Sequence, residues 1–222
     1  MPADPADAHG VIDVVPLKWG WLLADHRYRA NRNRVNPRCM PRIHILGAAG
    51  SGTSTLGVAL AGALGVPHVD ADSLYWLPTN PPFTTLRPAI ERQALLKRTL
   101  PVGGHWVFSG AATEWAAPLE SSYDLVVFLR LDPAVRLVRL RQREAARYGA
   151  RILPGGDMAE INASFMAVAE AYDTAGSIHR GLAAHEAWLI DQPAPVVRLD
   201  TRAPVKHLLA VLMDRLASPK SS

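Results

Sequence analysis

Hydrophobic and polar positions follow two different periods along residues 42–217 of the chain. Short apolar runs, of the kind that form buried parallel strands, cover 42–46, 67–70, 106–110, 124–131 and 196–199. Between these runs apolar residues recur every three or four positions, as Leu56, Leu60 and Leu64 do, which is typical of helices packed on one side. Strands that alternate with helices predict a parallel α/β sheet with right-handed crossovers. We therefore expect a five-stranded parallel sheet flanked by helices, the later ones at 133–148, 158–173, 177–190 and 203–217.

A glycine-rich turn joins the first predicted strand to the first predicted helix. Residues 47–55 fit the phosphate-binding pattern G-x-x-x-x-G-K-[ST], except that Thr53 occupies the lysine position. Glycines let the backbone approach a ligand closely, and the amide N–H groups of the turn and helix start attract anions. The turn predicts a nucleotide phosphate site with the Ser54 hydroxyl as an Mg²⁺ ligand; a glycine turn that binds no ligand is the alternative. The expected lining is Gly47, Ala48, Ala49, Gly50, Ser51, Gly52, Thr53, Ser54 and Thr55.

The positive charge that the missing lysine would have supplied is expected from residues 130–151. This segment carries seven arginines against two acidic residues, and the loop 149–157 that ends it is rich in glycine. Arginines spaced three and four apart on the predicted helix share one face. We interpret the loop as a mobile lid whose guanidinium groups bind phosphate and exclude water. The expected catalytic arginines are Arg130, Arg143, Arg147 and Arg151; the alternative is a solvated helix face, favoured most for Arg136 and Arg139.

Other polar residues follow the predicted strands at the edge where open α/β sheets bind ligands. We expect Asp70 to hold Mg²⁺ and Asp72 to orient, or take the proton from, an acceptor hydroxyl, with helix capping as the alternative for one of them. Aromatic residues after this pair are expected to stack on a flat acceptor, and an arginine to bind an acceptor phosphate; simple packing is the alternative for the aromatics. The acceptor-binding residues predicted here are Asp70, Asp72, Tyr75, Trp76 and Arg87.

Composition sets limits on the class of protein. A chain of 222 residues, 49% hydrophobic, suits one domain with a sizeable core, which we place at residues 40–222. The single cysteine excludes an intramolecular disulfide, and no apolar run of about 18 residues predicts a membrane span, so we expect a cytoplasmic protein. Residues 1–39 predict a disordered leader, or a start assigned too far upstream, because Met40 directly precedes the first strand. A nucleic acid contact is expected only from the basic stretch Arg27 to Arg34.

With these residues in place, the chain resembles P-loop kinases of the adenylate kinase and shikimate kinase type over residues 40–217. The likeness rests on the phosphate turn, the Asp70-x-Asp72 pair, the arginine-bearing lid and the sequence Val-Arg-Leu-Asp-Thr at 197–201. It implies a three-layer sandwich and a phosphotransferase that uses ATP and Mg²⁺. Archaeal-type cytidylate kinases resemble this chain in carrying Thr for the lysine, and the order of motifs looks most like bacterial adenylate kinase-like proteins. By this likeness Asp200, Thr201 and Arg202 line the adenine pocket, and Ser109 and Gly110 belong to the acceptor loop.

Three functions stay open on these grounds. The first is an ATP-dependent kinase with a nucleotide or nucleoside acceptor. The second is a kinase for a hydroxyl acceptor of the shikimate or gluconate type, which would depend on Asp72 and the Ser109-Gly110 turn. The third, of another class, is an ATP-binding regulatory protein in which Thr53 marks weakened catalysis. The expected partner is a small-molecule acceptor without a membrane contact, and the chain is expected to be a monomer or a dimer.

Overall fold

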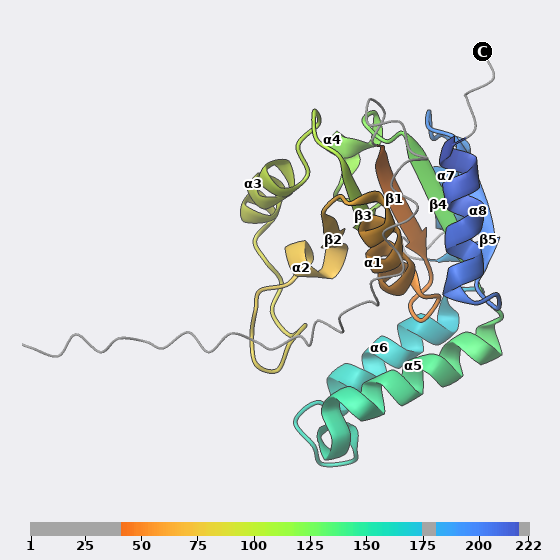
Figure 1. Cartoon of the computed structure of the whole chain (residues 1–222). Coiled ribbons are helices and arrows are strands. Elements are labelled where there is room, and N and C mark those ends of the chain that lie inside the picture. The colour runs from red at the N-terminus through yellow and green to blue at the C-terminus, as the bar shows by residue number, and fades with distance from the viewer. Residues whose placement is uncertain (1–40, 175–180, 218–222) are drawn as a thin grey trace, which may run out of the picture. The chain divides into compact units, whose positions relative to one another are not determined.

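The computed structural model describes residues 41–174 and 181–217 (Figure 1). Its five strands form one parallel sheet with the order β2-β3-β1-β4-β5. The predicted five-stranded parallel α/β sheet is therefore confirmed. The predictions for residues 1–39, including Arg27 to Arg34, lie outside the described residues. The strands are β1 Arg42–Gly47, β2 His68–Asp70, β3 Trp106–Ser109, β4 Leu125–Arg130 and β5 Val196–Asp200.

The helices follow the predicted order, and the differences are local. Two short helices, α2 and α4, were not predicted, and the loop 149–157 begins with a single 3₁₀ turn, η2. The helix expected at 177–190 begins, within the described residues, at Leu182. No helix in the described ranges combines the length and the apolar character needed to cross a membrane. The helical elements are α1 Thr53–Leu64, α2 Ala71–Tyr75, α3 Ala89–Thr99, α4 Ala117–Glu120, α5 Pro133–Tyr148, η2 Gly149–Ile152, α6 Ala159–Ala171, α7 Leu182–Ile190 and α8 Val205–Ala217.

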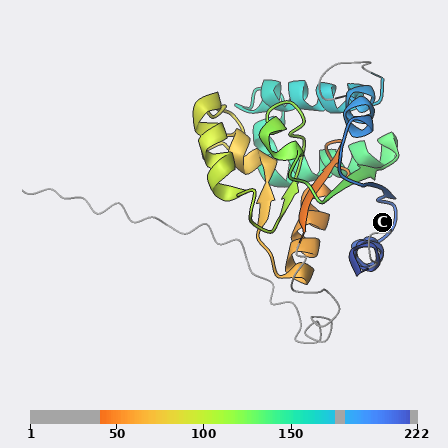
Figure 2. The same ribbon diagram turned by 90° about the horizontal axis from the view of Figure 1, so that it is seen from above.

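Two hydrophobic clusters lie on opposite faces of the sheet because successive strand residues point to opposite sides. Ile43 and Ile45 of β1 belong to the cluster covered by α1 and α8. Leu46 of the same strand belongs to the other cluster, to which α3 contributes Leu96 and α7 contributes Leu189. Figure 2 shows α1 and α8 on one side of the sheet and α3 and α7 on the other. The sheet is thus buried on both faces, which explains why its strands read as nearly continuous apolar runs.

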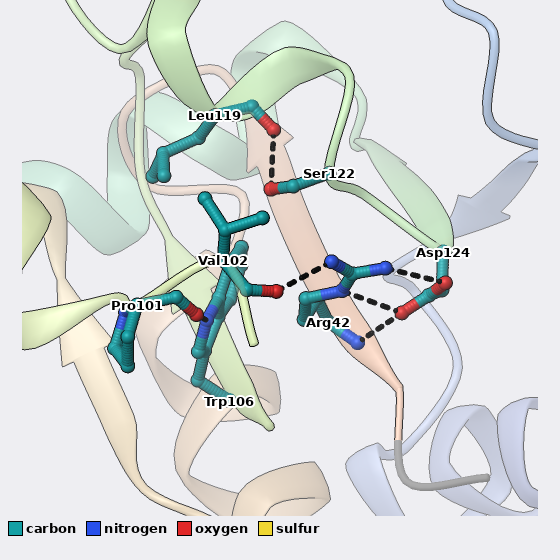
Figure 3. Close-up of polar contacts among 7 residues, drawn as sticks. All are labelled: Arg42, Pro101, Val102, Trp106, Leu119, Ser122 and Asp124. Atoms are coloured by element: carbon teal, nitrogen blue, oxygen red, sulfur yellow. Dashed lines mark hydrogen bonds and ion pairs between the residues drawn. The ribbon is translucent and has the colours of Figure 1, made fainter. Parts of the chain in front are cut away.

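An arginine ties the amino-terminal ends of β1 and β4 together, as Figure 3 shows. The Arg42 side chain donates to both carboxylate oxygens of Asp124, at 2.9 and 3.1 Å, and to the Val102 carbonyl at 2.6 Å. The Arg42 backbone N–H donates to the same carboxylate at 2.9 Å. These hydrogen bonds fix the amino-terminal ends of β1 and β4. The loops that follow the two strands lie at the opposite edge of the sheet.

Helices α5 and α6 lie side by side beyond the carboxyl ends of the strands (Figure 1). Together with η2 they form a helical hairpin over residues 133–171, called the lid hairpin below. Asp132 starts α5, since its side chain accepts from the backbone N–H groups of Ala134 and Val135. Pro133 occupies the first helical position, where its missing N–H costs nothing. The hairpin therefore begins directly where β4 ends, beside the glycine-rich turn.

Candidate functional site

The glycine-rich turn is closed by its own backbone and opens α1. The Ser51 N–H donates to the Ala48 carbonyl at 3.0 Å, and Gly52 is the N-cap of the helix. Gly50 and Gly52 have φ angles of 85° and 96°, a region that favours glycine. Among the described residues, no side chain accepts a hydrogen bond at the N-cap of α1. The first amide N–H groups of the helix are therefore available to an anion. This is the geometry that the phosphate-site prediction requires.

Two of the glycines are also required by packing. A Cβ atom on Gly47 would lie 2.7 Å from the Leu129 carbonyl oxygen, and one on Gly50 would lie 2.9 Å from the Arg136 carbonyl oxygen. Both distances are shorter than real Cβ contacts. The glycine-rich turn therefore packs directly against the end of β4 and the start of α5. These neighbours leave no room for a side chain at Gly47 or Gly50, so they hold the backbone of the turn in its present conformation.

Ser54 and Asp70 meet at the start of α1. The Ser54 hydroxyl donates to Asp70 Oδ2 at 2.5 Å, while Asp70 Oδ1 accepts from the Asp72 backbone N–H at 3.0 Å and so caps α2. The capping alternative for Asp70 is therefore correct, and the same carboxylate still faces Ser54. Mg²⁺ is usually bound by one or two protein oxygens together with waters and substrate phosphates. A hydroxyl and a carboxylate next to the glycine-rich turn fit that ligand set.

One pocket brings the turn together with residues from β2, β3 and the lid hairpin. Asp70 and Asp72 line it beside the turn, with Gly110 from the end of β3 and Arg143 from α5. Helix α6 contributes apolar side chains, so the lid hairpin already covers part of the turn. The complete lining is Gly47, Ala48, Ala49, Gly50, Thr53, Ser54, Asp70, Asp72, Gly110, Ala111, Arg143, Phe165, Val168, Ala169, Tyr172 and His185.

Of the four expected catalytic arginines, only Arg143 lines this pocket. Arg130 pairs with Glu186 at 3.3 Å, and Arg151 pairs with Asp157 at 2.6 Å at the far end of the hairpin. That hydrogen-bonded pair raises the pKa of Arg151. The Arg147 guanidinium lies 5.0 Å from the centre of the Phe83 ring. The catalytic roles of Arg130, Arg147 and Arg151 stay predictions, and each would require the residue to leave its present contact.

The expected adenine-binding residues lie at the end of β5, outside the pocket lining. Asp200 and Arg202 form an ion pair of 2.7 Å, which lowers the pKa of Asp200. Thr201 is buried, and its hydroxyl donates to the Arg130 carbonyl at 3.2 Å. Their role at an adenine base stays a prediction.

Two expected acceptor contacts need correction. Ser109 is fully buried and lies 2.9 Å from His68 Nε2, so its side chain lies in the core and only the neighbouring Gly110 reaches the pocket. Arg87 donates from Nε to the Leu74 carbonyl at 2.9 Å and from Nη2 to the Trp76 carbonyl at 3.0 Å. Its guanidinium therefore braces the backbone around the end of α2, which leaves it poorly placed to bind an acceptor phosphate.

The aromatic side chains after Asp72 contact one another. The Tyr75 and Trp76 rings are 5.3 Å apart and nearly perpendicular, and the Trp76 and Phe83 rings are 6.5 Å apart. The packing alternative describes these contacts better than stacking on an acceptor base. A role for Tyr75 and Trp76 in acceptor binding accordingly stays a prediction.

Two arginines with evident contacts were not assigned to the site from the sequence. Arg92 of α3 holds its guanidinium 4.7 Å from the centre of the Tyr75 ring and 5.3 Å from that of Trp115. For Arg136 a solvated helix face was the alternative to phosphate binding, but its side chain is only 1% exposed and contacts the glycine-rich turn. The signals for Arg136 were its place in the arginine row and its position in the first turn of α5, next to the end of β4.

No protein-family model matches the chain. It is 43% identical over 176 residues to the uncharacterized protein YqaC of Bacillus subtilis (strain 168), a match that covers 79% of this chain and 97% of that protein. The shikimate kinase of Acinetobacter baumannii in complex with shikimate superposes with a TM-score of 0.50 at 16% identity, over 82% of this chain and 96% of that one. The shikimate kinase of Bacteroides thetaiotaomicron gives a TM-score of 0.48 at 19% identity, over 81% of this chain and 100% of that one. The superposition on the first of these kinases shows that the chain has the P-loop kinase fold.

Proposed function

The chain belongs to the family of Bacillus subtilis YqaC, and we propose that it is an ATP- and Mg²⁺-dependent kinase that phosphorylates a hydroxyl group of a small molecule. The observation that carries the proposal is the contact between Ser54 and Asp70 beside the glycine-rich turn, in the pocket that also contains Asp72 and Arg143. Phosphoryl transfer depends on positioning and on charge neutralisation. This pocket supplies groups for both.

Each part of the pocket has a role in this proposal. The N–H groups of the turn hold the nucleotide phosphates, and Ser54 and Asp70 would hold Mg²⁺, which when bound neutralises charge on the phosphates. Asp72 orients the acceptor hydroxyl and takes its proton as the new oxygen–phosphorus bond forms and the bond to ADP breaks. Arg143 exchanges its present partner, Glu144 at 2.8 Å, for the transferred phosphoryl group.

The acceptor we propose is a small hydroxy acid of the shikimate or gluconate class, ahead of the nucleotide or nucleoside expected at first. Arg87, which a nucleotide acceptor would need, is engaged by backbone carbonyls. The structure that superposes with a TM-score of 0.50 is a shikimate kinase, which is consistent with a hydroxyl acceptor.

Arg92 supports an acidic acceptor. Its Nε atom is buried and has no hydrogen-bond partner within the described residues, and its guanidinium lies close to the rings of both Tyr75 and Trp115. Tyr75 follows Asp72 by one helical turn, and Trp115 lies five residues after Gly110. A cation held beside the proposed base and the β3 loop suits a carboxylate on the acceptor.

The test is coupled ADP release over a panel of hydroxy acids, nucleosides and nucleoside monophosphates. A hydroxy acid is expected to support turnover, and Asp72→Asn is expected to lower kcat at least about tenfold, or about 1.4 kcal/mol in the barrier. Arg92→Met is expected to raise the KM of the acid without changing that of ATP, with the exposed Arg98→Met on the same helix as the matched control. Turnover with nucleotides alone would restore the nucleotide acceptor. ATP binding without turnover on any acceptor would favour the regulatory protein.

A further inference from the structure

Arg136 is a buried cation directly behind the glycine-rich turn. Its side chain is 1% exposed, and its guanidinium donates to the Ala49 carbonyl at 3.2 Å and to Asp173 Oδ2 at 2.9 Å. The same group lies 5.3 Å from the centre of the Tyr172 ring. The loop between β1 and α1 lies against the first turn of α5, since a Cβ atom on Gly50 would lie 2.9 Å from the Arg136 carbonyl oxygen. Arg136 thus contacts both the turn and the segment that follows α6.

The contact with Ala49 fixes the direction of one peptide group. In a trans peptide the C=O and N–H bonds point in opposite directions, and the only cis bond in the described ranges is Asn80-Pro81. With the Ala49 carbonyl held towards Arg136, the Gly50 N–H points away from Arg136. Both Ala49 and Gly50 line the pocket. The Gly50 N–H is thus turned away from Arg136 in a residue that lines the pocket, which is the orientation that a phosphate bound to the turn would require.

A charged donor on a carbonyl also polarises the amide it belongs to. Hydrogen bonds in a chain strengthen one another, and those made by ionised groups are the strong ones. The carboxylate of Asp173 balances the charge of Arg136, so the pair adds little to the field far from it. Its influence is local, through the Ala49-Gly50 peptide. Because the Gly50 α-carbon packs against the Arg136 backbone, the peptide has little room to rotate.

We infer that Arg136 is a positioning residue of the phosphate site, which aligns and polarises the Gly50 N–H for a nucleotide phosphate. The inference rests on the proposed function, since it assumes that the turn binds a nucleotide. The inference also changes which residues are expected to compensate for the lysine that Thr53 replaces in the phosphate-binding pattern. Some of the phosphate stabilisation that the lysine position lacks comes from behind the loop, through the fixed and polarised Ala49-Gly50 peptide, rather than only from the exposed arginines of the lid hairpin.

The test is equilibrium binding of MgADP and of adenosine, measured by calorimetry on wild type, Arg136→Met, Arg136→Lys and Arg141→Met. Arg141 is the matched control, since it lies on the same helix and pairs with Glu170 of α6 at 2.6 Å, but it is 58% exposed and lies away from the turn. Arg136→Met is expected to weaken MgADP binding at least about tenfold while adenosine binding stays within about twofold, because only the phosphates contact the Gly50 N–H. Arg136→Lys is expected to be intermediate, since an ammonium group lacks the planar fork that reaches both partners. Arg141→Met is expected to match wild type.

A merely structural role for Arg136 would weaken MgADP and adenosine binding by the same factor, and that outcome overturns the inference. An unchanged affinity of Arg136→Met for MgADP overturns it too. If Arg136→Met does not melt cooperatively, Arg136→Lys carries the same comparison. A wild-type chain that binds no MgADP overturns the proposed function itself, and so is distinguishable from a failure of Arg136 alone. The Gly50 amide proton gives a second readout by NMR: its chemical shift is expected to move on adding MgADP to wild type, and to move less in Arg136→Lys.

Discussion

The lid hairpin takes part in two Arg–Asp pairs, one at its base with Asp173 just after α6 and one at its tip, and the shorter pair is not the more important one. At the tip Arg151 and Asp157 are 2.6 Å apart, with side chains 40% and 60% exposed. At the base Arg136 and Asp173 are 2.9 Å apart, with side chains 1% and 22% exposed. Water screens the first pair and is largely excluded from the second. Burial and further contacts, more than the distance between charges, decide what such a pair does.

The two pairs also differ in what else the cation touches. Arg136 donates to the Ala49 carbonyl in the glycine-rich turn. Beyond Asp157, no residue in the described ranges forms a hydrogen bond with the Arg151 guanidinium. The base of the hairpin therefore contacts the glycine-rich turn in its present conformation, whereas the tip can reach the turn only if the hairpin moves.

Removing the acidic partner should lower the free energy of unfolding far more at the base of the hairpin than at its tip. Asp173→Ala leaves a buried guanidinium without its counter-charge, which typically costs about 3 kcal/mol or more of unfolding free energy. Asp157→Ala is expected to leave the urea midpoint unchanged, because both partners at the tip are in water. Urea denaturation of both variants checks this. Equal midpoints would mean that water reaches Arg136 and that the base is no different from the tip.

Acid should destabilise the sheet before it affects the tip. Burial lowers the pKa of His44 to about 3 from an ordinary value of 6.5, so the folded chain keeps this imidazole neutral while the unfolded chain takes up a proton below about pH 6.5. Stability present at pH 7 is thus lost as the pH falls, by about 2 kcal/mol at pH 5. The hydrogen bond from Arg151 lowers the pKa of Asp157 below 3.8, so the tip loses its contribution only below about that pH.

Urea midpoints at pH 7 and pH 5 measure this effect, and His44→Phe is the comparison variant. His44 lies in β1 between aromatic rings, with Phe108 at 5.0 Å and Tyr123 at 5.1 Å. A phenyl ring keeps these contacts and removes the titrating group. The substitution should therefore reduce the pH dependence between these two values, and His68, whose pKa burial also lowers, keeps a share of it. An unchanged dependence would assign the acid sensitivity to other groups.

The sequence allowed the sheet and the glycine-rich turn to be predicted, because both depend on neighbours along the chain. Apolar runs predict the strands, and the spacing of Gly47 and Gly50 predicts the turn, without reference to residues far away in the sequence. The roles of Arg87, Ser109 and Arg136 could not be predicted in this way. Their partners are carbonyls or side chains brought near by the tertiary fold, such as Asp173, which is 37 residues from Arg136. Helical spacing indicates which arginines share a face of α5, but not where along the helix that face becomes buried.

Two glycines with the same backbone angle give a matched test of base and tip. Gly50 and Gly155 both have a φ of 85°, but a Cβ atom on Gly50 would lie 2.9 Å from the Arg136 carbonyl oxygen, and one on Gly155 would meet nothing within 4 Å. Gly155→Ala should therefore cost only the left-handed backbone strain, about 1–2 kcal/mol. Gly50→Ala should cost more than this and also weaken MgADP binding, which calorimetry on both variants measures. If the two variants match in stability and in binding, the turn tolerates displacement and Arg136 does not fix it.

The smallest expected effect concerns two members of the arginine row, one in the pocket and one at the tip. Arg143 lines the pocket and Arg151 does not, so Arg143→Met should lower kcat about tenfold, or about 1.4 kcal/mol in the barrier. Arg151→Met should lower it less, because Arg151 must first leave Asp157. Steady-state kinetics with the acceptor identified by the panel measures both, and the KM for ATP shows whether binding or turnover is affected. A loss with Arg151→Met as large as that with Arg143→Met would mean that the hairpin closes far enough for its tip to reach the phosphates during turnover. Asp157→Asn separates two causes of such a loss. Turnover would be kept in this variant if Arg151 acts on phosphate, because the arginine remains, and would fall as in Arg151→Met if the Arg151–Asp157 pair only holds the tip together.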